Sequence, residues 1–310
     1  MRRYLSVILI VCSLLCLLTG CQKQSRSTVF AMDTVMDLQV WGKDAEGATQ
    51  RLGDLLKELE DRWSATSGNS ALGQLNRGED PDLSTEETEL LQAVEALSDR
   101  TGGALDPKLY DVCLAWGFYN GAHHIPTEEE LAAAMAASRW DLGAVMKGYA
   151  GQQSVQMLAS LDVDRAILNL GGNIQTFGEK PDGKPWQIGI QNPDGGDYIG
   201  TVAVTGTASV VTSGDYQRYF EQDGVRYHHI IDPATGAPAR SGLRSVTVIC
   251  RDGLTADGLS TALFVMGLEK AADFWRASND FEAVFITEDG KVYATHGAEF
   301  SGCDYEVIAR

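Results

Sequence analysis

The 310-residue sequence has little positive charge and few cysteines. It carries 25 Lys and Arg against 43 Asp and Glu, a formal net charge of −18. A surface this acidic does not neutralise phosphate backbones, so we do not expect nucleic-acid binding. Of the six cysteines in the sequence, the three beyond residue 21 (Cys113, Cys250 and Cys303) are widely separated and odd in number, so neither a disulfide framework nor a CxxC-type metal site is indicated, and we expect all three to be buried. There is no repeat of fixed period and no low-complexity linker, and the apolar content of 44% excludes intrinsic disorder.

An almost uninterrupted apolar run at residues 4–18 follows the basic start Met1-Arg2-Arg3. It is too short for a membrane span and is typical of an export signal. The run ends in Leu-Thr-Gly-Cys21, which resembles a bacterial lipobox. The resemblance implies a lipoprotein signal peptide at 1–20, a lipid on Cys21, a tether at 21–28 and a place on the extracytoplasmic face of the bacterial cell membrane. A plain signal peptide with an incidental cysteine is the alternative.

The remaining residues, 29–310, read as one α+β domain with mixed β-sheets and flanking helices. Helices weighted to the first half and strands to the second disfavour a regular βαβ alternation. Apolar spacing and two capping boxes, at Ser84 and Thr127, predict helices. The expected helices are 43–63, 84–101, one from 127, 145–161 and two segments from 255 past Gly267. The expected strands are 29–41, 166–170, 174–177, 186–191, 201–204, 209–212, 227–231, 245–250, 283–287 and 291–295, and 64–76 is expected to be a loop.

Two glycine-containing segments imitate nucleotide-binding motifs. Residues 178–184 have P-loop spacing, but Pro185 stands where a Ser or Thr would bind magnesium, so a turn is expected. Gly171-Gly172 lacks the G-x-G-x-x-G spacing of a dinucleotide-binding fold. This pair is either a tight turn beside a ligand or a simple turn.

Two segments combine charged and hydroxyl side chains. Asp141 precedes a predicted helix that carries Lys147 in its first turns, which places opposite charges near one helix start. An Asp N-cap with a solvated Lys explains the same residues. Residues 212–216, Thr-Ser-Gly-Asp-Tyr, with Arg218 close behind, form either an anion nest or a turn.

Two further segments carry histidine and carboxylate. His228 and His229 lie on opposite sides of a predicted strand, so one faces a pocket and the other solvent. The residues from 232, Asp-Pro-Ala-Thr-Gly, indicate a turn. Asp257 and Thr261 share one helix face, and their oxygens suit a hard cation such as Mg²⁺, although two ligands alone do not define a site.

Taken together and in this order, these four segments resemble the ApbE family. The resemblance extends from about residue 29 to residue 293 and includes Ala-Met32-Asp-Thr and Gly-Ala-Leu-Asp106-Pro. It implies an ApbE-like fold with an FAD cleft between two lobes. It also implies an FAD:protein FMN transferase, which cleaves FAD at its diphosphate, esterifies FMN to a Thr or Ser hydroxyl and releases AMP.

The resemblance also implies roles for individual residues. His229 is the general base, since an imidazole pKa of about 6.5 suits proton removal near neutral pH. Lys147 adds positive charge near the phosphates. Mg²⁺ is held by Asp257, Thr261 and the backbone carbonyl of Ala144. The residues that line the FAD are Met32, Ala104, Leu105, Asp106, Asp141 and Ile231. The implied partner is an acceptor flavoprotein with an Asp-x-x-(Ser/Thr)-Gly-Ala-Thr-like segment.

One position departs from the family pattern. Thr66 occupies a place where many members have an aromatic residue, and Trp63 lies three residues earlier. Two alternative functions use the same residues. In an FAD pyrophosphatase water replaces the acceptor hydroxyl and the products are FMN and AMP. A flavin-binding lipoprotein would hold FAD without chemistry.

Overall fold

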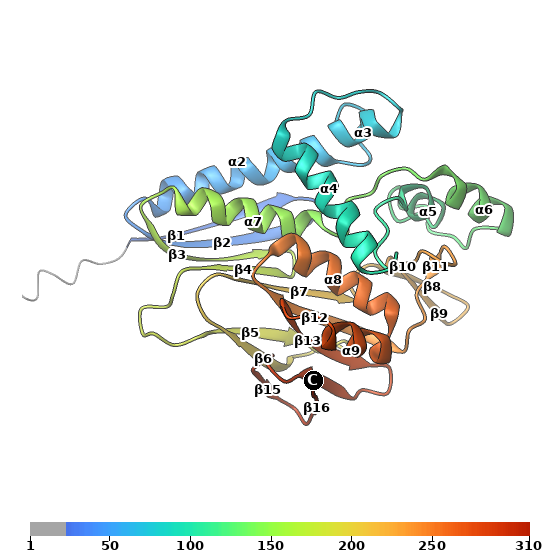
Figure 1. Ribbon diagram of the computed structural model, residues 1–310. Helices are drawn as coiled ribbons and strands as arrows, with labels where there is room; N and C mark the ends of the chain where they lie inside the picture. The colour runs from blue at the N-terminus through green and yellow to red at the C-terminus, as the bar shows by residue number, and fades with distance from the viewer. Residues whose placement is uncertain (1–22) are drawn as a thin grey trace, which may run out of the picture.

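The computed structural model describes residues 23–310 (Figure 1). The predicted signal peptide and the lipidation residue Cys21 lie outside the described residues. Within residues 23–310, no helix is long and apolar enough to cross a membrane.

One nine-stranded sheet runs through the whole domain in the order β1-β2-β3-β4-β7-β12-β13-β14-β16. All neighbouring strands are antiparallel except β14 and β16, so the sheet is mixed. Its strands are β1 (Gln24–Ala31), β2 (Thr34–Gly42), β3 (Val163–Leu170), β4 (Asn173–Phe177), β7 (Ala208–Gly214), β12 (Leu243–Cys250), β13 (Phe281–Thr287), β14 (Val292–Thr295) and β16 (Glu306–Ile308).

Smaller sheets flank the large one. A three-stranded sheet packs on it through a cluster of buried side chains that includes Trp186, Val202 and Val284. Its strands are β15 (Phe300–Gly302), β6 (Tyr198–Val204) and β5 (Trp186–Gln191). Two hairpins are separate, β8 (Tyr219–Gln222) with β9 (Val225–His228) and β10 (Ile231–Asp232) with β11 (Ala237–Pro238).

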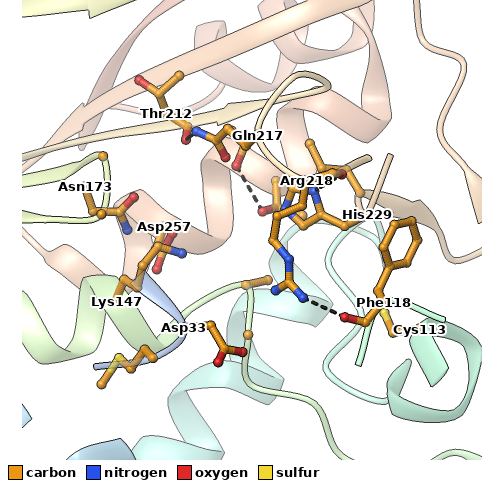
Figure 2. A pocket seen from close by; sticks show the side chains of 18 of the residues that line it. Asp33, Cys113, Phe118, Lys147, Asn173, Thr212, Gln217, Arg218, His229 and Asp257 are labelled. Carbon is orange, nitrogen blue, oxygen red and sulfur yellow. Dashed lines mark hydrogen bonds between the residues drawn. The ribbon is translucent and has the colours of Figure 1, made fainter. Parts of the chain in front are cut away.

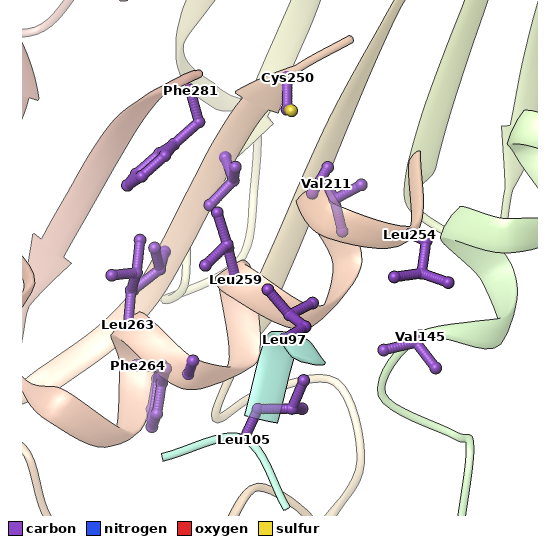
Figure 3. Packing of buried hydrophobic residues seen from close by; sticks show 14 of the residues in the cluster. Leu97, Leu105, Val145, Val211, Cys250, Leu254, Leu259, Leu263, Phe264 and Phe281 are labelled. Atoms are coloured by element: carbon purple, nitrogen blue, oxygen red, sulfur yellow. The ribbon is translucent and has the colours of Figure 1, made fainter. Parts of the chain in front are cut away.

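Helices cover the opposite face of the large sheet (Figure 1). Two lie over β1 to β4, namely α2 (Ala45–Trp63) and α7 (Met146–Ala159), and two lie over β7, β12 and β13, namely α8 (Gly253–Met266) and α9 (Leu268–Arg276). The others are α3 (Ala71–Asn76), α4 (Thr85–Arg100), α5 (Tyr110–Ala115) and α6 (Glu128–Ala137). Figure 3 shows Leu259, Leu263 and Phe264 of α8 packed between the sheet and residues 97–105. The predicted α+β class is confirmed.

The predicted capping boxes are present. The hydroxyl of Ser84 accepts from the Glu87 amide, and the Glu87 carboxylate accepts from the Ser84 amide. Thr127 and Glu130 make the same pair of bonds. These short-range bonds fix where α4 and α6 begin. Residues 178–184 form the expected turn between β4 and β5.

The single strand predicted at 29–41 is wrong, because the chain reverses at Met32 and Asp33. Both residues have positive φ, 52° and 57°, which the sequence does not signal with Gly or Asn. A tertiary contact supports the turn, since the amide of Met32 donates to Glu60 Oε1 at 2.8 Å. Residues 24–28, expected to be tether, are paired in β1 along their whole length.

Three further expectations differ from the structure. The loop expected at 64–76 contains α3, which begins after an N-cap at Ser70 that accepts from Gly73. The strand expected at 227–231 is interrupted at His229, because the chain turns there to place β10 beside β11. Cys113, Cys250 and Cys303 were all expected to be buried, but only Cys250 is buried, whereas Cys113 is partly buried and Cys303 is exposed in the loop between β15 and β16.

Candidate active site

A cavity of about 690 Å³ opens at one end of the large sheet. Pockets of this size hold cofactor-sized ligands. Its lining includes every residue predicted for catalysis, FAD binding or the metal, and these residues come from five separate parts of the chain. These residues are Met32, Ala104, Leu105, Asp106, Asp141, Ala144, Lys147, His229, Ile231, Asp257 and Thr261.

A smaller cavity of about 200 Å³ adjoins the first and shares Met32, Asp141 and Lys147 with it. Trp63 and Thr66 both line this smaller cavity. Trp63 is 4% exposed and packs in the main core, so its ring reaches the cavity as part of a fixed wall.

One side of the main cavity, which we call the helical wall, consists of the first turns of α7 and the start of α8. The two helices touch at glycines. A Cβ atom built on Gly148 would lie 2.0 Å from the backbone oxygen of Gly253, and one on Gly253 would lie 2.2 Å from that of Gly148. Only glycine permits this approach.

The close approach brings Asp257 of α8 against the start of α7. Its Oδ2 accepts from the Gly148 amide at 2.8 Å, and the residue is 3% exposed. Burial raises the pKa of Asp257, while Lys147, the Gly148 amide and Asn173 act in the opposite direction. Lys147, Asp257 and Asn173 lie together on one side of Figure 2.

The helical wall contains oxygen atoms that could act as ligands of a hard cation. Among residues 23–310, no Lys or Arg forms an ion pair within 4.0 Å with the buried Asp257 carboxylate, although the charge of Lys147 acts on it. Thr261, one turn later in α8, and Ala144 line the same cavity. The Thr261 hydroxyl lies 3.3 Å from the Ser213 hydroxyl. In the part of the chain that the structure describes, no cluster of three or more His, Cys, Asp or Glu is placed to hold a metal. A metal here would therefore use one carboxylate and neutral oxygens, and would leave positions for substrate oxygens.

Asp141 holds the turn that carries Ala144. Its Oδ1 accepts from the Gly143 amide at 2.8 Å, and its Oδ2 accepts from the Tyr119 hydroxyl at 2.6 Å. The alternative of an Asp141 N-cap is wrong, because α7 is preceded by Val145 and has no side-chain cap. Sequence reasoning missed Tyr119, which contacts Asp141 only through the fold.

The opposite side, which we call the strand-and-turn wall, consists of residues 216–218 and 229–231, which flank the β8–β9 hairpin. Its central residue is His229, whose backbone amide donates to the Arg218 carbonyl at 3.0 Å. Nδ1 lies 3.2 Å from the same carbonyl. A carbonyl only accepts, so Nδ1 carries the proton and Nε2 is the acceptor of the neutral ring.

Positive charge surrounds this imidazole. Burial and the charges of Arg218 and Lys147 lower the pKa of His229 to about 3, so the ring is neutral at pH 7. Arg218 is held in turn, because its Nη2 donates to the Phe118 carbonyl at 2.7 Å. Figure 2 shows Arg218, His229 and Phe118 together, on the side away from Asp257.

His228 and His229 do face opposite ways, but His228 faces the core rather than solvent. It is 3% exposed, its Nε2 lies 3.0 Å from the Ala239 carbonyl, and its ring meets Phe264 edge-on. Burial lowers the pKa of His228 to about 4. Asp232 initiates the predicted turn, since its Oδ1 accepts from the Ala234 amide.

The Gly171-Gly172 turn lies beside the cavity and contributes to its lining. Both glycines have positive φ, 69° and 97°. This favours the interpretation of a tight turn next to a ligand. Asn173, which follows the turn and also lines the cavity, was not singled out from the sequence.

Comparisons with known proteins agree with this geometry. A model of the ApbE family matches residues 32–285. The chain belongs to the ApbE family. The matched range contains all eleven predicted residues of the main cavity. ApbE relatives include a protein of Klebsiella pneumoniae named FAD:protein FMN transferase, 33% identical over 87% of this chain and 93% of its own length. A protein of the same name from Treponema pallidum is 31% identical over 95% of this chain and 94% of its own length.

Solved ApbE structures share the fold. The crystal structure of an ApbE protein from Thermotoga maritima has a TM-score of 0.81 and 31% identity, with 87% of this chain and 96% of that chain covered. The flavin transferase ApbE from Vibrio cholerae has a TM-score of 0.77 and 30% identity, with 88% and 97% covered. The expected ApbE-like fold is confirmed.

Proposed function

We propose that this chain is an FAD:protein FMN transferase. In the reaction, FMN moves from FAD to a Ser or Thr hydroxyl of an acceptor flavoprotein, a phosphoester forms and AMP leaves. The observation that carries the proposal is one cavity in which Asp257 and Thr261 face a neutral imidazole, His229, across a space of cofactor size. The names of the ApbE relatives support the same reaction.

The residues divide the chemistry between the two walls. Bound Mg²⁺ at Asp257, Thr261 and the Ala144 carbonyl would neutralise diphosphate charge and polarise the phosphorus under attack. Lys147 and Arg218 add fixed positive charge. His229 Nε2 takes the proton of the acceptor hydroxyl, whose oxygen attacks the FMN phosphorus. The bond from this phosphorus to the bridging oxygen breaks, and AMP departs with that oxygen.

Substrate binding tunes the base. Burial holds the pKa of His229 low in the free protein, and the charges of Arg218 and Lys147 lower it further. An anionic diphosphate beside these two cations offsets their charge, so the pKa of His229 rises when FAD binds. The imidazole therefore becomes a better proton acceptor once the substrate is in place.

The decisive experiment offers the purified protein FAD, Mg²⁺ and a folded acceptor domain that carries an Asp-x-x-Ser-Gly-Ala-Thr segment. The expected product is an acceptor that stays fluorescent on a denaturing gel, with one AMP released per flavin bound. Free FMN and AMP with an unlabelled acceptor would assign the pyrophosphatase alternative. Bound but intact FAD would assign the non-catalytic alternative.

We also propose that the protein is a lipoprotein anchored to the membrane through Cys21. The Leu-Thr-Gly-Cys sequence at the end of the apolar run supports this. In cells, a Cys21→Ser variant is expected to lose labelling by a radioactive fatty acid, whereas a Cys303→Ser variant keeps it. Equal labelling of the Cys21→Ser variant would contradict the anchor.

A further inference from the structure

The outer face of the β1–β2 hairpin carries four cross-strand pairs, and the pair farthest from the turn, Gln24 with Trp41, includes an indole that packs near Trp186. The other cross-strand neighbours on this face are Arg26 with Gln39, Thr28 with Asp37, and Phe30 with Val35. The first two pairs suit solvent, and Thr28 donates to Asp37 at 2.8 Å. Phe30 is 65% exposed and Val35 is 55% exposed. Two large apolar side chains therefore stand together in solvent at the turn end of this face, next to the polar pair of Thr28 and Asp37.

The apolar pair adjoins the active-site cavity. Phe30 and Val35 are one register position from the turn formed by Met32 and Asp33, and both turn residues line the cavity. Figure 2 shows Asp33 at the cavity that contains Arg218 and His229. The contact between the Met32 amide and Glu60 anchors the turn to α2. The pair thus lies beside a fixed turn that lines the cavity.

We propose that Phe30 and Val35 form a docking contact for the acceptor protein, the second substrate of the proposed transferase. This inference rests on the proposed function. A protein acceptor must bring its hydroxyl to His229, so the surface around that hydroxyl must meet the enzyme at the rim of the cavity. Two exposed apolar side chains there fit an apolar patch beside the modified Ser or Thr.

The position of Phe30 and Val35 argues against the membrane as the surface that covers them. β1 begins at Gln24, three residues after the proposed anchor at Cys21. Phe30 lies six residues further along an extended strand, about 20 Å from Gln24 at about 3.3 Å per residue. The apolar pair is therefore at the end of β1 that points away from the anchor and toward the cleft.

A double variant, Phe30→Thr with Val35→Thr, tests the proposal. Threonine has a high β-strand propensity, like Phe and Val, but it exposes less apolar surface. The matched control is Tyr198→Thr on β6, which replaces a 70% exposed aromatic residue in another sheet. With FAD and Mg²⁺ saturating, the KM for the folded acceptor domain is expected to rise about tenfold in the double variant, with kcat and the Kd for FAD unchanged. Tyr198→Thr is expected to leave all three constants unchanged.

The other outcomes overturn the proposal. An unchanged KM with a lower melting temperature would assign the pair to hairpin stability. If the KM is unchanged but the wild type is a dimer and the double variant is a monomer, Phe30 and Val35 serve self-association. An unchanged KM with weaker binding to phosphatidylglycerol vesicles would assign the pair to the membrane. Failure of the wild type to label the acceptor would refute the proposed function itself, whereas labelling with equal KM refutes only the docking contact.

A milder variant guards against a folding defect. Val35→Thr alone is nearly isosteric and is expected to raise the KM for the acceptor about threefold. A Kd for FAD equal to that of the wild type shows that the cavity is intact in each variant. If neither variant changes the KM while both bind FAD normally, the docking contact is refuted.

Discussion

The two walls of the cavity are built in different ways. The helical wall holds Asp257 and Thr261 through close packing of buried helices, with Gly148 and Gly253 in backbone contact. The strand-and-turn wall orients His229 through bonds to a single carbonyl, that of Arg218. Cation ligands need fixed separations, which a packed core supplies. A proton acceptor needs one orientation and one tautomer, which two hydrogen bonds supply.

The strongest test of this comparison removes one functional group from each wall. Asp257→Asn keeps an acceptor for the Gly148 amide, and His229→Gln keeps a donor for the Arg218 carbonyl. Each is expected to lower kcat by about a thousandfold, because each removes a charge or proton-transfer role in the transition state. The Mg²⁺ concentration for half-maximal rate is expected to rise at least about tenfold only in Asp257→Asn.

Steady-state rates over a Mg²⁺ titration measure this difference. The Kd for FAD, measured by flavin fluorescence without metal, serves as the control for an intact cavity. Equal Mg²⁺ dependence in the two variants would remove Asp257 from the metal site.

The next test strains the helical wall. In Gly148→Ala the new Cβ meets the Gly253 carbonyl, so the free energy of unfolding is expected to fall by about 3 kcal/mol. Gly53→Ala in α2 is the matched control. Its Cβ meets only the flexible tip of Val29 at 3.3 Å, and alanine favours a helix, so stability is expected to stay within about 1 kcal/mol of the wild type.

Urea denaturation followed by circular dichroism measures both glycine variants. Equal stability of Gly148→Ala and Gly53→Ala would show that the crossing of α7 and α8 is not tightly packed.

The smallest expected effect is the pH dependence of the rate, which is set by His229 in the strand-and-turn wall. Because the pKa of His229 is lowered to about 3, the free protein keeps a neutral imidazole at every pH above about 4. The kcat/KM for FAD, which reports the free enzyme, is therefore expected to change less than about twofold between pH 8 and pH 6. A histidine with the ordinary pKa of about 6.5 would lose about three quarters of its neutral form at pH 6. Such a loss in the measured profile would contradict the lowering of this pKa by burial, Arg218 and Lys147.

The parts of the fold that could be predicted are those encoded locally. The capping boxes at Ser84 and Thr127 each involve residues three apart, so the sequence displays them completely. The reversal at Met32 and Asp33 depends on Glu60, 28 residues away, and no local signal marks it. The short strands β8, β10, β11, β15 and β16 likewise depend on their partners.

The candidate site shows the same division. The spacing of Asp257 and Thr261 and the alternation of His228 and His229 predict which side chains share a face, and the structure agrees. Their convergence on one cavity entered only through the family resemblance, because it requires the α7–α8 crossing. The bond from Tyr119 to Asp141 joins a turn to a loop 22 residues later, so periodicity alone does not reveal it.

The proposed anchor at Cys21 would lie close in sequence to the large sheet. On the proposed anchor, Gln22 and Lys23 alone separate the lipidated residue from β1, which extends about 26 Å for its eight residues at about 3.3 Å each. The strand is hydrogen-bonded to β2 throughout, so it belongs to the body of the domain and does not lengthen the tether. Under the lipoprotein proposal, a two-residue connection would therefore restrict the enzyme to acceptors within reach of a domain that stays close to the lipid surface.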